Sequence, residues 1–294
     1  MKPRSYGPFA YSALPRRAPI SWPGGARVAL WVILNIEFFS LAESVPAGSG
    51  GIGVKPPDVP SWAARDYGNR VGVFRLMKVL DRYGIHASVA LNADICMQHP
   101  EIIEECQARK WEFMGHNESN TRRLNELPAG EEHAAIRNAL DTIERATGAR
   151  PRGWLGAGLQ ETWNTLDFLA VEGCEYVCDW PNDDQPYLMT LEGGGELVSV
   201  PYSLELNDKP AYEKRNRTAD EFHDMIVRQF RVLYEEGAES GRVVAIALHP
   251  YLSGVPHRIG ALDAALQVIC RHEGVWRATG GEIAREFRRQ TPRA

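Results

Sequence analysis

Side chains capable of acid–base chemistry stand at the ends of apolar runs in this sequence. Glu37 follows the run 27–36, His116 follows 111–114, and His249 follows 243–248. Further side chains that could bind a substrate occupy similar positions: Asn35, Asn92, Asn120, Trp154, Asp179 and Trp180. One carboxylate and two imidazoles suffice to activate a water molecule and to protonate a leaving group. Their convergence at one pocket would therefore predict hydrolysis by acid–base catalysis.

The apolar runs have the character of strands and alternate with helical patterns. Expected strands cover 27–36, 87–91, 111–114, 152–155, 175–178, 197–200, 243–248 and, more weakly, 275–278. The first run is almost continuously apolar, as in a strand buried on both faces. Helix ends are also recognisable, because Thr218 and Glu221 have capping-box spacing and Gly148 is placed to end a helix. The alternation predicts an α/β fold with a mostly parallel sheet, open or closed.

A parallel barrel would bring these residues together, because the C-terminal ends of its strands face one pocket. Each residue alone also has an ordinary structural explanation. A single histidine after a strand is more often structural, Glu37 could cap a helix, and Asp179 could anchor a turn. Buried tryptophans are more often core than binding surface. The shared position after the strands is what favours a site.

The Gly- and Pro-rich segment 40–69 interrupts the alternation. Long loops within compact domains are usually functional or mobile, and this one begins directly after Glu37. We therefore expect part of it to cover the pocket as a lid.

Length and composition fit one soluble domain. The 294 residues are 44% hydrophobic and 24% charged, with a net charge of −5, which gives no reason to expect nucleic acid or an anionic membrane as partner. We expect one barrel domain over 1–294, with 1–26 as an N-terminal extension. The five cysteines lack a repeating spacing, and no leader or spanning segment is evident. A cytoplasmic location fits best.

At these residues the chain resembles the polysaccharide deacetylase (carbohydrate esterase family 4) superfamily. The likeness runs from about Arg27 to the C-terminus, through 35–39, 116–120, 152–156, 179–187 and 247–249. The Gly153-Trp154 segment is closer to the branch of metal-independent allantoinases and cyclic imide hydrolases. The resemblance implies a distorted (β/α) TIM-like barrel with about seven parallel strands.

The chain departs from the family at its metal ligands. The resemblance places Phe38, His116 and Asn120 at the three ligand positions, and Phe38 has no lone pair to offer. We therefore expect no metal site and no required cofactor. A weakly bound divalent metal such as zinc, held through Glu37, His116 or Asn120, is the alternative.

The resemblance implies hydrolysis of a carbon–nitrogen bond in a small cyclic amide, imide or ureide. Glu37 would be the base, His249 the acid, and His116 would stabilise the oxyanion with Asn120 or Asn35. Two alternatives stay open: metal-dependent deacetylation of an acetylated sugar, and a non-catalytic binding barrel. By analogy with the allantoinase-like relatives, we expect a homo-oligomer, a tetramer.

Overall fold

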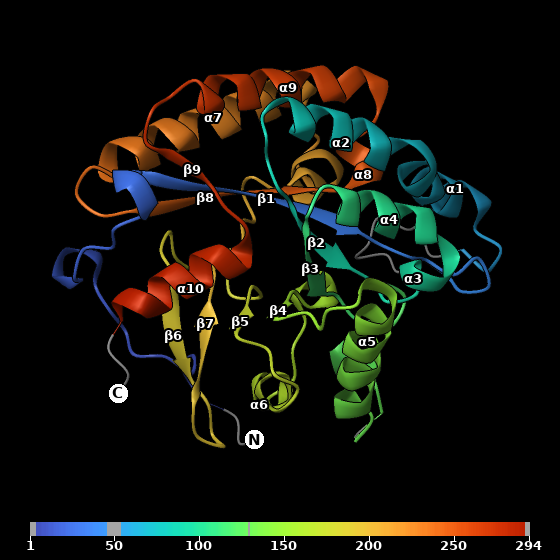
Figure 1. The fold of residues 1–294 in the computed structure, drawn as a ribbon. Coiled ribbons are helices and arrows are strands. Elements are labelled where there is room, and N and C mark those ends of the chain that lie inside the picture. Colours follow the sequence, from blue (N-terminus) through green and yellow to red (C-terminus); the bar gives the residue numbers. More distant parts are fainter. Residues whose placement is uncertain (1–3, 46–53, 129, 292–294) are drawn as a thin grey trace.

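The strands form one curled, mostly parallel sheet (Figure 1). The computed structural model describes residues 4–45, 54–128 and 130–291. Its strands are β1 (Val28–Ile36), β2 (Ser88–Leu91), β3 (Glu112–Gly115), β4 (Gly153–Trp154), β5 (Tyr176–Val177), β6 (Tyr187–Thr190), β7 (Glu196–Ser199), β8 (Arg242–Leu248) and β9 (Val275–Arg277). Neighbours follow the order β6-β7-β5-β4-β3-β2-β1-β8, and β9 pairs with the start of β1. Among these strands, β6 and β7 form the one antiparallel pair. The predicted α/β barrel is thus confirmed, as a half-barrel.

Most of the helices cover the outside of this sheet, whereas α10 (Gly280–Gln290) lies within its curl, against Trp31 and Tyr176 (Figure 1). The other helices are α1 (Val59–Tyr67), α2 (Val73–Arg82), α3 (Ile95–Gln98), α4 (Pro100–Ala108), α5 (Glu132–Thr147), α6 (Thr165–Val171), α7 (Ala219–Glu236), α8 (Pro250–Ser253) and α9 (Pro256–Cys270). Helices α7 and α9 lie side by side, with α7 against β8. The capping box of Thr218 and Glu221 is present at the start of α7. No helix within the described ranges is both long enough and apolar enough to cross a membrane.

Strand β1 is the centre of the sheet. It pairs with β8 along one edge and with β2 and β9 along the other. All nine of its residues are buried, which is what the continuous apolar run predicts for a strand covered on both faces. The strand is therefore fixed on every side, and the residues that follow it, including Glu37, begin from a rigid point.

Two segments differ from the sequence-based prediction. Strand β6 was not predicted, because it is only four residues long and is half exposed at the edge of the sheet. The expected lid, 40–69, contains helix α1, capped by Asp58, and runs into the π-helical turn η4 (Gly68–Gly72). Residues 46–53 of that segment lie outside the described residues. The rest of the segment is therefore not one long loop.

The N-terminal extension joins the two ends of the half-barrel. Gly241, just before β8, donates its backbone N–H to the carbonyl of Ile20 at 2.7 Å. Gln185, just before β6, donates to the carbonyl of Gly241 at 2.9 Å, and Arg17 donates to Asp183 at 2.7 Å. These contacts connect segments that do not pair as strands. We call this region, made up of 17–20, 183–185 and 241, the seam.

Candidate active site

A cavity of about 270 Å³ opens at the C-terminal ends of the strands. Glu37 reaches it from the end of β1, His116 from the end of β3, and His249 from the end of β8. All three residues are less than a tenth exposed. The structure therefore brings the three predicted catalytic side chains to one cavity, although more than two hundred residues of sequence separate the first from the last.

Glu37 is the centre of the cluster. Its Oε1 lies 3.5 Å from Nε2 of His249 and 3.8 Å from Nε2 of His116. The side-chain amide of Asn120 also donates to Oε1. The other oxygen, Oε2, is buried without a hydrogen bond and lies 3.9 Å from Nζ of Lys209. Burial raises the pKa of Glu37, but the charges of Lys209 and His249 outweigh burial and hold this pKa well below its usual range. Glu37 is a carboxylate at neutral pH.

His249 is oriented by Asp208, a residue that the sequence analysis did not single out. Nδ1 of His249 donates to Oδ1 of Asp208 at 2.7 Å, so Nε2 faces Glu37. The hydroxyl of Ser253 and the backbone N–H of His249 donate to the other carboxylate oxygen, at 2.6 and 2.8 Å. Burial lowers the pKa of His249, but Glu37 and Asp208 more than compensate and raise it to about 9. His249 therefore carries a proton at neutral pH and can act as an acid.

His116 has a different proton arrangement. Its Nδ1 hydrogen-bonds to the carbonyl oxygen of Leu155, which can only accept, so Nδ1 carries the proton. Nε2 of His116 is buried and has no hydrogen-bond partner. In the neutral ring this nitrogen presents a lone pair to the cavity. Neutral His116 can therefore accept a hydrogen bond there, and it can donate to an oxyanion only when it is doubly protonated.

The predicted amides have structural partners. Asn35 lines the cavity, and its amide nitrogen donates to the hydroxyl of Tyr202 and to the carbonyl of Leu248, at 3.2 and 3.3 Å. Asn92 does not line the cavity. It accepts from the backbone N–H of Phe38 at 2.8 Å and donates to Oδ1 of Asn120 at 3.1 Å. Asn92 thus connects the residues that follow β1 with those that follow β3.

The remaining predicted binding residues lie away from the cavity lining. Trp154 is fully buried in the core. Trp180 packs edge-on against Phe9 and donates to Glu161 at 3.0 Å. Asp179 accepts from the backbone N–H of Gly156 at 2.6 Å, and burial raises its pKa to about 7. Asp179 therefore contacts the backbone of one lining residue, Gly156, rather than the cavity itself.

The family's metal positions do not fit a metal well here. Phe38 has no donor atom, and Oδ1 of Asn120 already accepts from Asn92. Within the part of the chain that the structure describes, no group of three histidine, cysteine or carboxylate side chains could hold a metal ion. Only Nε2 of His116, among the three positions, offers a strong and unoccupied lone pair.

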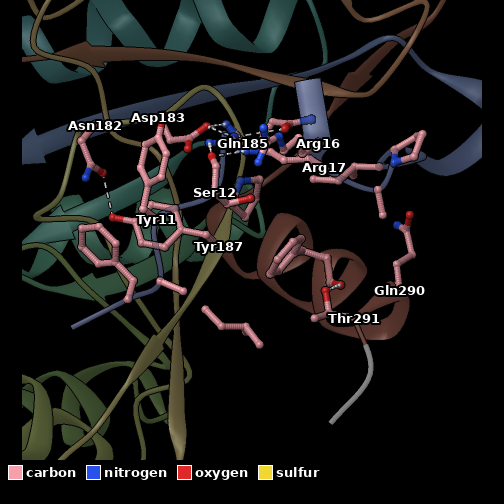
Figure 2. A pocket seen from close by; sticks show the side chains of 18 of the residues that line it. Tyr11, Ser12, Arg16, Arg17, Asn182, Asp183, Gln185, Tyr187, Gln290 and Thr291 are labelled. Atoms are coloured by element: carbon pink, nitrogen blue, oxygen red, sulfur yellow. Dashed lines mark hydrogen bonds and ion pairs between the residues drawn. The ribbon is translucent and has the colours of Figure 1, made fainter. Parts of the chain in front are cut away.

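A second cavity, of about 500 Å³, lies at the seam (Figure 2). Figure 2 shows Arg17 beside Asp183 and Gln185, with Tyr187, Gln290 and Thr291 around the opening. None of the three predicted catalytic residues lines it. We therefore locate the chemistry in the smaller cavity, where the acid–base groups converge.

Comparison with known proteins agrees with this fold. Residues 61–177 match the family model for polysaccharide deacetylase. A provisionally named polysaccharide deacetylase of Schizosaccharomyces pombe is 27% identical over 92% of this chain and 93% of that protein. The crystal structure of PuuE allantoinase superposes with a TM-score of 0.85 at 27% identity, covering 95% of this chain and 96% of that one. A provisionally named polysaccharide deacetylase of Pseudomonas aeruginosa superposes with a TM-score of 0.81 at 28% identity, covering 93% and 95%.

Fold and relatives together define a hydrolase that acts on carbon–nitrogen bonds. More particularly, residues 61–177 are similar to a polysaccharide deacetylase domain, and an allantoinase is among the structural neighbours of the chain. The resemblance read from the motifs is thereby confirmed.

Proposed function

We propose that the protein opens a small cyclic amide, imide or ureide by metal-independent hydrolysis. The observation that carries this proposal is the line Asp208–His249–Glu37, in which a carboxylate and a protonated imidazole face each other inside a cavity. Such a pair holds a base and an acid ready at the same pH. The allantoinase neighbour supports a small cyclic substrate, and the cavity of about 270 Å³ suits one.

In this mechanism Glu37 takes a proton from a water molecule as its oxygen attacks the carbonyl carbon. The intermediate then loses its carbon–nitrogen bond, and the departing nitrogen takes the proton from Nε2 of His249. At the end Glu37 is protonated and His249 is neutral. Because Oε1 and Nε2 are 3.5 Å apart, the proton can return directly to His249 after the product leaves. Imides and ureides suit this chemistry because a second carbonyl withdraws electron density from the leaving nitrogen.

A substrate panel tests the proposal. The purified protein would be incubated with hydantoins, cyclic imides, allantoin and N-acetylated sugars, and ring opening and acetate release would be measured. We expect ring opening and no acetate. Acetate release without ring opening would contradict the proposed substrate class.

Metal-dependent deacetylation is the second candidate, and one observation favours it. The lone pair on Nε2 of His116 faces the cavity next to Glu37, which is the arrangement of a histidine ligand. We expect a strong chelator to leave the activity unchanged and elemental analysis to find less than stoichiometric metal. Chelator-sensitive activity that zinc restores would favour the deacetylase.

A further inference from the structure

Lys209 brings a positive charge into the cavity. Its side chain is 14% exposed and lines the same cavity as Glu37 and His249. The distance of 3.9 Å from Nζ to Oε2 of Glu37 is too long for a hydrogen bond. Among the residues that the structure describes, no acceptor hydrogen-bonds to this ammonium group. The ammonium group thus lines the cavity without an acceptor among these residues, and it can bind an oxygen atom of a ligand there.

The other donors expected to stabilise an oxyanion are already engaged. The amide nitrogen of Asn35 donates to Tyr202 and Leu248. The amide nitrogen of Asn120 donates to Glu37. Neutral His116 presents a lone pair, since its proton is on Nδ1. Apart from His249, whose proton is assigned to the leaving nitrogen, Lys209 is thus the described polar side chain next to Glu37 whose donor is both charged and available.

We propose that Lys209 is a further catalytic residue, which binds the carbonyl oxygen of the substrate and stabilises the oxyanion of the tetrahedral intermediate. This proposal rests on the proposed function. When water attacks, the carbonyl π electrons move onto the carbonyl oxygen while Glu37 takes the proton of the water and becomes neutral. Negative charge therefore leaves Glu37 and appears on the substrate oxygen. The ammonium group of Lys209 therefore faces a negative charge on Glu37 before the step and on the substrate oxygen after it. Its interaction with that oxygen strengthens in the transition state, and such an interaction accelerates the reaction.

The local structure fixes the position of Lys209. Its backbone N–H donates to Oδ1 of Asn207 at 3.0 Å, and the π-helical turn η7 (Pro210–Lys214) follows directly. Asp208, the neighbouring residue, holds His249. One loop thus supplies both the partner of the acid and the cation for the oxyanion.

Three variants test the role of Lys209 in turnover. Lys209→Met should lower kcat by about 10²- to 10³-fold, the usual effect of removing one oxyanion donor. Lys209→Arg, which keeps the charge, should recover part of that loss. Lys78→Met on the exposed surface of α2 is the matched control and should stay within about twofold of the wild type. Thermal unfolding of each variant would show whether the fold is intact. A folded Lys209→Met variant with unchanged kcat would overturn the proposal.

A binding experiment separates this proposal from the proposed function. Methylphosphonate, a tetrahedral oxyanion, would be titrated into the wild type and into Lys209→Met by calorimetry. We expect binding to weaken at least tenfold in the variant. If the wild type binds methylphosphonate through Lys209 but opens no ring in the panel, the proposed substrate class is wrong and the anion site stands. If methylphosphonate binds equally to both proteins, or not to the wild type, the role of Lys209 is wrong whatever the substrate.

Discussion

At the scale of single residues, the site depends on Glu37 and His249 being charged together. Each stabilises the ionised form of the other across 3.5 Å, and Asp208 and Lys209 balance the remaining charges. The cluster thus holds two negative and two positive groups at neutral pH. This balance explains how Glu37, Asp208 and His249 can be buried next to one another, with Lys209 at the cavity.

Removing either half of the acid–base pair should abolish most of the activity. We expect Glu37→Gln and His249→Ala each to lower kcat by about 10²-fold or more, because each would lose one positioned proton transfer. Steady-state kinetics on the best substrate of the panel would measure this. Near-normal turnover in either variant would contradict the mechanism at that residue.

The pKa of His249 predicts the alkaline limb of the pH profile. The acid must be protonated, and its pKa is raised to about 9, so kcat/KM should be level at neutral pH and fall as the pH rises through about 9. The pKa of Glu37 lies well below its usual range, so kcat/KM should not fall on the acid side until the pH is below about 4, the ordinary range for a glutamate. A profile from pH 4 to 10 would test the alkaline limb and the absence of an acid limb above pH 4.

Asp208 offers a sharper version of the same test. Asp208→Asn removes a charge that raises the pKa of His249, so the alkaline limb should move to lower pH. A purely structural role for Asp208 would lower the activity without moving the limb. An unshifted limb would therefore contradict the assigned role of Asp208.

At the scale of elements, the strands could be predicted from the sequence better than the loops that complete the site. Strand β1 was predictable because all its residues except Asn35 are apolar, as in a strand buried on both faces. Asp208 and Lys209 were not, because they lie in an irregular segment without periodicity, and their partners are distant in the sequence. Helix α1 was hidden by the glycines and prolines around it, although its Asp58 cap is a recognisable signal.

Asn92 links the residues that follow β1 to those that follow β3, and a substitution can test this link. Asn92→Ala would remove the acceptor of the backbone N–H of Phe38 and the donor to the amide oxygen of Asn120. We expect a loss of about 1–3 kcal/mol in the free energy of unfolding, the cost of leaving buried polar groups unsatisfied. Urea denaturation would measure it. A change below about 0.5 kcal/mol would mean that these groups find other partners.

At the scale of the whole molecule, the N-terminal extension holds the two ends of the half-barrel together. Arg17 donates to both Asp183 and Gln185 across the seam, while its neighbour Arg16 is exposed (Figure 2). We expect Arg17→Ala to lower the free energy of unfolding by about 1 kcal/mol, the upper range for a partly exposed ion pair. Arg16→Ala is the matched control and should change it by less than about 0.5 kcal/mol. Equal effects of the two substitutions in urea denaturation would contradict this role of Arg17.

The position of β1 between β2 and β8 also has a consequence for biosynthesis. Glu37 emerges early from the ribosome, but its partner His249 follows more than two hundred residues later. At ~5–20 residues per second, roughly 10–40 s pass between them. During that time one edge of β1 lacks β8, the strand with which it pairs along most of its length, and an unpaired apolar edge invites aggregation. The nascent chain should therefore need protection, for example by a chaperone, until translation reaches β8.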